Sequence, residues 1–167
     1  MTTPATDPDR DPARVFRDTI GRFATGVAVV TAIGPGGPAG MTTNAVTSLS
    51  IEPRLLLVCF ATGARTLEVV RESRRFAVNI LRAGDEDLAA VFASKVVGPQ
   101  KFADVTHAEE HGVPVLDRAL AWVACDLLEL RPGGDHEIGI GRVLGTGSGE
   151  PGEPLVFFGG RYTTVAR

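Results

Sequence analysis

Short apolar runs separated by glycine and proline turns are the feature that most constrains how this chain can fold. Apolar and β-branched residues fill positions 27–33, 55–60 and 76–81, and runs of this length between turn signals are typical of buried strands. The chain contains 20 glycines and 11 prolines, which favour many short strands over a helix bundle. We therefore expect a mainly β fold.

The turns between the runs indicate how the strands connect. The Gly-Pro-Gly-Gly-Pro sequence at 34–38 predicts a hairpin that joins the first run to a polar segment at 40–50. The last third of the chain is also strand and turn, with runs at 120–130, 136–146 and 155–158. Six or seven strands with short helices at their connections predict a closed antiparallel barrel decorated by peripheral helices.

Helix signals are few and local. A helix is expected at 13–23, with Pro12 in its first turn and its apolar residues on one face. A second helix is expected at 65–71, and a third should follow Asp85, which can act as its N-cap. Positions 94–118 are expected to be irregular.

Length and composition favour a single domain with an ordinary core. We assign the domain to 13–167 and treat 1–12, which is polar and holds three prolines, as a flexible N-terminal tail. The net charge is −3 and no basic block stands out, which argues against a nucleic acid or an anionic membrane as the main partner. No run approaches the roughly 18 apolar residues of a membrane span.

The cysteines and the polar start of the chain predict a cytoplasmic location. No apolar signal segment occurs near Met1. Cys59 and Cys125 both lie within apolar runs, which is typical of core thiols in a reducing compartment.

The polar segment at 40–50 is the first candidate for a binding surface. It reads Gly-Met-Thr-Thr-Asn-Ala-Val-Thr-Ser-Leu-Ser between two apolar runs, so hydroxyl and amide groups would line a sheet with little bulk. Such a surface suits a flat polar ligand with a phosphate tail. A polar edge strand with no ligand is the alternative, since threonine is common in sheets.

Two literal motif matches are better explained as loops. His107 and His111 fit the H-x-x-E-H spacing of some zinc peptidases, but Gly112 and Pro114 follow at once, so no metal site is assigned. The segment 147–152 fits G-x-G-x-x-G, but its proline and the one at 154 preclude the helix that a dinucleotide fingerprint must open.

Three further pairs of residues suggest a ligand site when they are taken together. Asp135-His136 follows a glycine turn, where the carboxylate can fix or charge the imidazole. Arg65-Thr66 lies at an expected helix start, where free N–H groups attract phosphate, and Lys101-Phe102 sets a cation beside an aromatic ring. Asp135-His136 alone is equally compatible with a turn histidine that bonds to backbone, and each of the other two pairs alone is more often a solvated surface feature.

The order of these segments resembles the short-chain flavin reductases, the reductase components of two-component flavin-dependent monooxygenases. The resemblance rests on Phe-Ala-Thr-Gly at 23–26, the segment at 40–50, Glu52-Pro53, the strands at 57–60 and 76–81, Lys101-Phe102, Gly-Asp-His at 134–136 and Gly-Arg-Tyr at 160–162. It implies an FMN-binding split β-barrel and a homodimer. It also implies hydride transfer from NADH or NADPH to FMN or FAD, with the reduced flavin passing to a separate monooxygenase.

The resemblance also implies roles for particular residues. A catalytic role falls to His136, beside the nicotinamide with Asp135 and Tyr162. The flavin ring and its side chain would be lined by Thr43, Asn44, Ala45, Val46, Thr47 and Ser48, with Val58, Cys59 and Phe60 in the strand beneath. The phosphate would be held by Arg65, Thr66 and Lys101, with Phe102 packed nearby. Relatives often have a serine in the loop that here reads Ala64-Arg65, so Ala64 is a departure within the phosphate loop.

Two other functions are compatible with the same residues. A flavin-binding electron carrier would hold FMN tightly and make no productive contact with a nicotinamide. A split barrel similar to pyridoxamine-phosphate oxidases would use another cofactor. The visible spectrum of the purified protein distinguishes all three.

Overall fold

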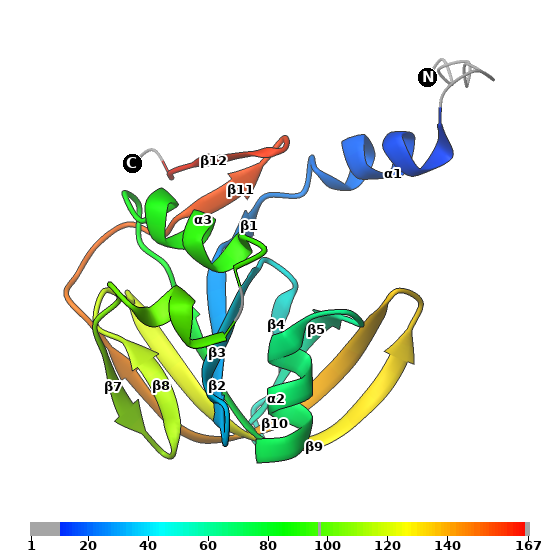
Figure 1. Cartoon of the computed structure of the whole chain (residues 1–167). Helices are drawn as coiled ribbons and strands as arrows, with labels where there is room; N and C mark the ends of the chain where they lie inside the picture. The colour runs from blue at the N-terminus through cyan, green and yellow to red at the C-terminus, as the bar shows by residue number, and fades with distance from the viewer. Residues whose placement is uncertain (1–10, 97, 166–167) are drawn as a thin grey trace.

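The computed structural model describes residues 11–96 and 98–165, and its main feature is one strongly curved sheet (Figure 1). Within this part of the chain seven strands pair in the order β3-β2-β6-β9-β10-β5-β4, and every neighbouring pair is antiparallel. The strands are β2 (Ala28–Gly34), β3 (Gly37–Thr43), β4 (Val46–Ser50), β5 (Leu55–Ala61), β6 (Arg75–Ile80), β9 (Ala121–Gly133) and β10 (His136–Ser148). The expected mainly β split barrel is confirmed.

The hairpin and helix expectations are confirmed with shifted boundaries, but the Asp85 carboxylate does not cap the helix that follows it, because it pairs with Arg118 instead. β2 and β3 pair through a tight turn in which Gly34 faces Gly37. The helices are α1 (Pro12–Ile20), α2 (Arg65–Ser73) and α3 (Glu86–Ala93). Within the described residues no helix exceeds nine residues, so none has the length and apolar character needed to cross a bilayer.

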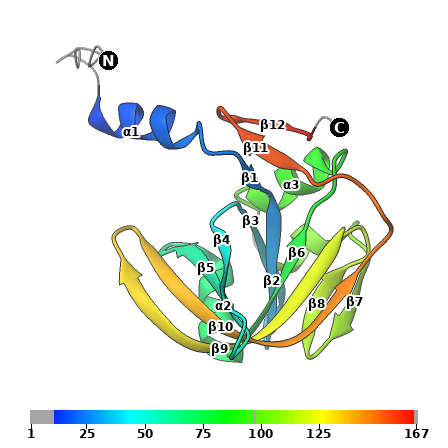
Figure 2. The ribbon, with the colours of Figure 1, turned by 180° about the vertical axis from the view of Figure 1, so that it is seen from behind.

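The N-terminal tail expected at 1–12 lies outside the described residues, except for its last two positions. Asp11 caps α1, because its carboxylate accepts a hydrogen bond from the Ala13 amide at 3.1 Å. Pro12 occupies the first turn, as the sequence predicts. The helix then extends away from the barrel in both views (Figures 1 and 2).

The expectation of a single polar strand at 40–50 is wrong in one respect, because the segment forms two strands with a turn between them. The amide of Ala45 donates to Thr43 Oγ1 at 3.1 Å, which turns the backbone out of β3. The Ala45 carbonyl then accepts from the Cys59 amide at 3.0 Å, which starts β4 against β5. The polar segment therefore joins the two opposite edges of the seven-stranded sheet and brings them close together.

The expectation that 94–118 is irregular is also wrong. It contains the 3-10 helix η1 (Gly98–Phe102) and the hairpin β7 (His107–Glu110) and β8 (Val113–Leu116). His111 and Gly112 adopt positive φ angles of 53° and 76° at the turn. The sequence of β7 is polar and fully exposed, so it lacks the apolar alternation that predicts a strand.

A third small sheet closes the top of the molecule beside α3. It pairs β1 (Thr25–Gly26), β11 (Val156–Phe158) and β12 (Arg161–Thr163) in the order β1-β11-β12. Only β11 was anticipated from the sequence pattern, because β1 and β12 are two- and three-residue strands. This sheet brings Tyr162, near the C-terminal end of the chain, close to the start of β2.

Side-chain alternation along β2 divides the apolar interior into two main cores. Ala28, Val30 and Ala32 point into the barrel, where they pack with Phe60, Phe76 and α2 residues. Val27 and Val29 point outward, into a second core built with α3 and η1. β2 is thus buried on both faces, and the two cores position the helices that line the site.

Candidate functional site

A cleft of about 420 Å³ opens between the start of α2 and the end of α3. We call it the α2–α3 cleft. Its floor is β3, from Ala39 to Thr42, and η1 closes one side with Gly98 and Lys101. Its other lining residues are Ala61, Gly63, Ala64, Arg65, Thr66, Phe92, Ala93, Ser94, Lys95 and Val96. The sequence-predicted residues Ala64, Arg65, Thr66 and Lys101 therefore meet in one cavity.

Lys101 is a buried cation with no carboxylate partner among the described residues. Only 8% of the residue is exposed, and its ammonium donates to two backbone carbonyls, Phe92 O at 2.7 Å and Gly40 O at 3.3 Å. Burial lowers the pKa of Lys101 from its ordinary 10.5. Two carbonyl acceptors leave the third ammonium hydrogen for a ligand in the cleft.

The start of α2 adds backbone donors to this charge. The residue before the helix is Ala64, whose side chain cannot cap it, so the first amides lack the side-chain acceptor that a serine could supply. Arg65 stands at the first position and Thr66 is buried behind it. Arg65, Lys95 and Lys101 line the cleft, and no Asp or Glu does so among the described residues. The cleft is therefore suited to an anion.

Two further hollows continue the cleft along the polar segment. The tyrosine hollow, of about 120 Å³, is lined by Val27, Thr42, Thr43, Asn44, Phe157 and Tyr162. The barrel-mouth hollow, of about 370 Å³, includes Asn44, Val46 and Thr47 together with apolar residues of the barrel strands, such as Leu56. Thr42 borders both the α2–α3 cleft and the tyrosine hollow. Asn44 borders both the tyrosine hollow and the barrel-mouth hollow. The three cavities therefore lie next to one another along the polar segment, and we call them together the track.

The side chains along this track are held in place by short polar contacts. Asn44 donates to Thr25 Oγ1 at 3.0 Å, and Thr42 donates to the Ala89 carbonyl of α3 at 2.7 Å. Tyr162 stacks edge-on against Phe157 with a centroid distance of 5.7 Å. The track therefore has a cationic end at α2 and a hydroxyl, amide and aromatic end at β12.

Asp135 and His136 lie at the tip of the β9–β10 hairpin, beside the rim of the α2–α3 cleft. His136 pairs in register with Ala61, and the Thr62 amide and hydroxyl donate to the Asp135 carbonyl at 3.0 and 3.1 Å. The Asp135 carboxylate contacts His136 Nδ1 at 2.7 Å, and this contact lowers the pKa of Asp135. Neither side chain lines the three cavities, so both flank the site.

Several predicted site residues point away from the track. Val58 and Phe60 are fully buried in the barrel core, where Phe60 meets Phe76 at 5.9 Å. Phe102 packs behind Lys101 against Phe92 at 5.0 Å. The remaining predicted residues, Ala45, Ser48 and Cys59, lie on β4, β5 and the turn before β4 but do not line the cavities.

Sequence reasoning missed the contribution of Thr42 and of the segment after α3. Thr42 belongs to the same polar segment as the predicted residues, so the segment itself was a sufficient signal. Ser94 and Lys95 follow an amphipathic helix directly, and a hydroxyl and a cation at a helix end could have marked them.

The two motif matches have structural explanations. His107 packs against Phe102 at 5.2 Å and His111 against Trp122 at 6.2 Å, on a strand and a turn rather than a helix. The glycine motif opens no helix, as its prolines predict, but the expected loop is too long, because Gly147 and Ser148 are the last residues of β10 and pair with Trp122 and Ala121.

Fold and site together define a class: a split-barrel protein with adjoining cavities that are cationic at one end and lined by hydroxyl, amide and aromatic groups at the other. The chain belongs to the flavin reductase like domain family, whose model matches residues 20–166.

The chain is similar to proteins named as flavin reductases and as a monooxygenase reductase component. It is 40% identical to the reductase component of a 4-nitrophenol 4-monooxygenase/4-nitrocatechol 2-monooxygenase of Rhodococcus opacus, over 88% of this chain and 78% of the relative. It is 33% identical to an FMN reductase (NADH), RutF 2, of Rhizobium rhizogenes, over 99% and 96%. The solved structure of the NADH:FAD oxidoreductase SgcE6 of Streptomyces globisporus C-1027 is 34% identical, with a TM-score of 0.89 and full coverage of both chains.

Proposed function

We propose that this protein is an NADH-dependent flavin reductase that supplies reduced flavin to a separate flavin-dependent monooxygenase. The observation that carries the proposal is the track described above. In it a cationic cleft, which no carboxylate of the described residues lines, adjoins a hydroxyl- and amide-lined hollow beside Tyr162. The relatives support it, because they are named as FMN reductase (NADH), NADH:FAD oxidoreductase and monooxygenase reductase components.

The residues of the cleft fit the phosphate of a flavin nucleotide. Arg65 offers a planar guanidinium, Lys101 offers an ammonium hydrogen, and the first amides of α2 add neutral donors. Thr66 contributes a buried hydroxyl at the same helix end. Ala64 leaves this end without a competing side-chain acceptor, so the departure from a serine does not remove the anion site.

The polar segment fits the ring and the ribityl chain. Thr43 and Asn44 line the tyrosine hollow, and Val46 and Thr47 line the barrel-mouth hollow. Amide and hydroxyl donors at the edge of a flavin ring stabilise the negative charge that reduction leaves on it. Ala45, Ser48 and Cys59 complete the surrounding strands, while Val58, Phe60 and Phe102 support the site from the two cores.

His136 is proposed to position the nicotinamide. The bound flavin supplies the hydride acceptor, so the protein must hold the two rings face to face and exclude water. The Asp135 carboxylate fixes one imidazole nitrogen and leaves the other ring nitrogen for the nicotinamide carboxamide. Tyr162, which the resemblance groups with His136, lines the tyrosine hollow rather than the cleft beside His136, so its proposed role is to close the site beside Thr43 and Asn44.

A homodimer is part of the proposal. Phe16 and Phe23 are 67% and 71% exposed, and Val15 and Ile20 are exposed on the same projecting segment. α1 buries none of its residues in the described chain, although its apolar positions share one face. A second copy of the chain that covers this face would remove the apolar surface from water. The cytoplasm is the proposed compartment, in keeping with two unpaired cysteines.

A steady-state assay with purified protein tests the proposed function. NADH oxidation should be slow without flavin and should rise with added FMN or FAD until it saturates. The same assay with NADPH measures the preference between the nicotinamides. If neither flavin stimulates the oxidation of either nicotinamide, the proposal is wrong.

A further inference from the structure

Lys101 holds two walls of the α2–α3 cleft together at one point. Its ammonium donates to the carbonyl of Phe92, the next-to-last residue of α3, at 2.7 Å, and to the carbonyl of Gly40 in β3 at 3.3 Å. The last carbonyls of a helix have no acceptor role within the helix, and they attract a cation. The position of the ammonium therefore depends on how closely the end of α3 approaches β3.

The absence of a side chain at Gly40 allows this close approach. A Cβ atom at Gly40 would lie 2.6 Å from Phe92 Cε1 and 2.7 Å from Phe92 Cδ1, far inside the ordinary carbon–carbon contact distance of about 3.5–4.0 Å. Gly40 does not have a positive φ angle, unlike Gly37 at the start of the same strand. Space, rather than backbone conformation, is therefore what requires a glycine at this position.

The Phe92 ring is enclosed on its other sides, so it cannot turn away from a larger residue. It is buried and packs edge-on against Phe102 with a centroid distance of 5.0 Å. Thr42, on the same face of β3 as Gly40, donates to the Ala89 carbonyl about one turn earlier in α3 at 2.7 Å. A side chain at Gly40 would consequently push the end of α3 away from β3.

We infer that Gly40 and Phe92 are positioning residues for the anion site, because the contact between them fixes where the Lys101 ammonium lies in the α2–α3 cleft. All three residues line this cleft. A wider gap between α3 and β3 would leave the ammonium with one of its two carbonyls and would misalign its third hydrogen with a bound phosphate. The inference rests on the proposed function, since it assumes that a flavin phosphate binds at Lys101.

Equilibrium titration of single and double variants with FMN tests the inference. Gly40→Ala should raise the FMN dissociation constant about tenfold, the effect of weakening a hydrogen bond to a charged group. The rate of flavin reduction at saturating FMN should change by less than about twofold, because the substitution leaves His136 in place. Addition of Phe92→Leu removes the Cε1 atom and should return the dissociation constant to within about threefold of that of Phe92→Leu alone.

Two further variants separate positioning from general stability. Gly141→Ala is the matched control, because a Cβ atom there would lie 2.5 Å from Phe76 Cζ in the barrel core, and Gly141 lines none of the three cavities of the track. It should lower the temperature of thermal unfolding and leave the FMN dissociation constant of the folded protein unchanged. In a Lys101→Met background, Gly40→Ala should change that constant by less than about twofold, because its effect acts through the ammonium.

The outcomes separate this inference from the proposed function. Wild-type affinity in Gly40→Ala, an undiminished loss in the Lys101→Met background, or an equal loss in Gly141→Ala would overturn the inference and leave the flavin reductase intact. If Gly40→Ala does not fold by itself, the double variant with Phe92→Leu decides: an affinity about tenfold below that of Phe92→Leu would overturn the inference. A wild-type protein that binds neither FMN nor FAD would overturn the proposed function itself.

Discussion

Lys101 is a buried cation, and its burial affects both its pKa and its ability to bind a phosphate. Its ammonium is held by two carbonyls rather than by a carboxylate, and burial lowers its pKa below 10.5. Only the protonated form attracts a phosphate dianion, so flavin binding should weaken as the pH rises through this lowered pKa. The folding stability of the unliganded protein depends on pH in the opposite direction. It rises with pH between the folded and unfolded pKa values of Lys101, because the unfolded chain binds more protons in that range.

A titration with Lys101→Met checks this prediction. The variant should bind FMN about 10- to 100-fold more weakly at neutral pH, the range expected for losing a hydrogen bond to a charged group. It should also lose the alkaline fall in affinity that the wild type shows. A fall of the same size in the variant would assign the pH dependence to another group. Thermal unfolding of both proteins in the absence of flavin measures the structural part of the effect.

His136 should affect hydride transfer more than flavin binding, because it flanks the site and does not line the cleft. We expect His136→Ala to slow reduction of the bound flavin by roughly 10- to 100-fold, the cost of a misplaced reactant. The dissociation constant of FMN should change much less. Stopped-flow reduction by NADH and equilibrium titration measure the two effects, with His111→Ala, which lies against Trp122, as the control. Equal loss of both properties would contradict the role.

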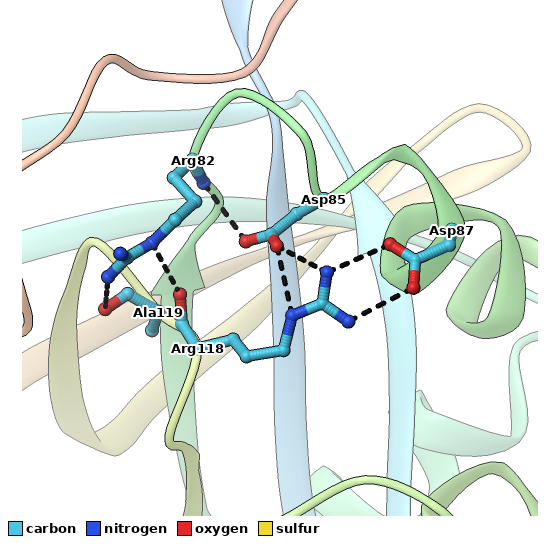
Figure 3. Close-up of polar contacts among 5 residues, drawn as sticks. All are labelled: Arg82, Asp85, Asp87, Arg118 and Ala119. Atoms are coloured by element: carbon cyan, nitrogen blue, oxygen red, sulfur yellow. Dashed lines mark hydrogen bonds and ion pairs between the residues drawn. The ribbon is translucent and has the colours of Figure 1, made fainter.

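At the scale of elements, α3 is held in place by an ion-pair cluster at its start (Figure 3). The Arg118 guanidinium contacts buried Asp85 at 2.6 Å and exposed Asp87 at 2.9 Å. Asp85 also accepts a hydrogen bond from the Arg82 amide at 3.3 Å. Because the other end of α3 forms a wall of the α2–α3 cleft, this cluster should set the shape of the anion site.

Removal of Arg118 should loosen α3 and weaken flavin binding. Arg118→Gln leaves the buried Asp85 carboxylate without its cation, which should cost roughly 1–3 kcal/mol of stability. Hydrogen exchange should show the loss in α3, and the FMN dissociation constant should rise. Arg131→Gln, which removes an exposed pair with Glu129 on β9, is the control. Unchanged exchange in α3 would refute the role of the cluster.

The ion pair between Asp87 and Arg118 predicts that the stability of α3 falls at acid pH. The hydrogen bond from Arg118 lowers the pKa of Asp87 below 3.8. The stability that this pair contributes is therefore present above pH 3.8 and is lost as the pH falls through the lowered pKa.

Strong periodicity made most elements predictable, and local polar contacts made others unpredictable. β2, β5 and β6 are apolar runs between turns, so the sequence pattern located them. The break between β3 and β4 depends on a threonine hydroxyl that accepts from Ala45, which no periodicity reveals. β7 is exposed along its whole length and takes its structure from pairing with β8.

The candidate site was predictable to the same extent. Residues whose chemistry is visible in the sequence, such as Arg65, Thr66 and Lys101, do line the cleft. Val58 and Phe60 could not be placed, because strand residues alternate between faces and the sequence alone does not say which face is the core. Lys95 was missed, although its place directly after an amphipathic helix, beside a serine, could have marked it.

At the scale of the whole molecule, the projecting α1 is the feature that the fold of one chain does not explain. An apolar helix face in water is unfavourable by roughly 25 cal/mol per Å². The double variant Phe16→Asp and Ile20→Asp should therefore shift the protein from dimer to monomer. Native mass spectrometry measures the change, and Arg14→Asp on the same helix serves as the control. A wild-type monomer, or a variant that still dimerises, would contradict the proposal.

The central claim is that the track, from Arg65 and Lys101 to Asn44 and Tyr162, holds a flavin nucleotide. A crystal structure of the protein soaked with FAD or FMN tests it most directly. We expect the phosphate next to α2 between Arg65 and Lys101, and the ring along Thr43 and Asn44. Flavin bound elsewhere, or bound in the reverse direction with its phosphate beside Tyr162, would contradict the account.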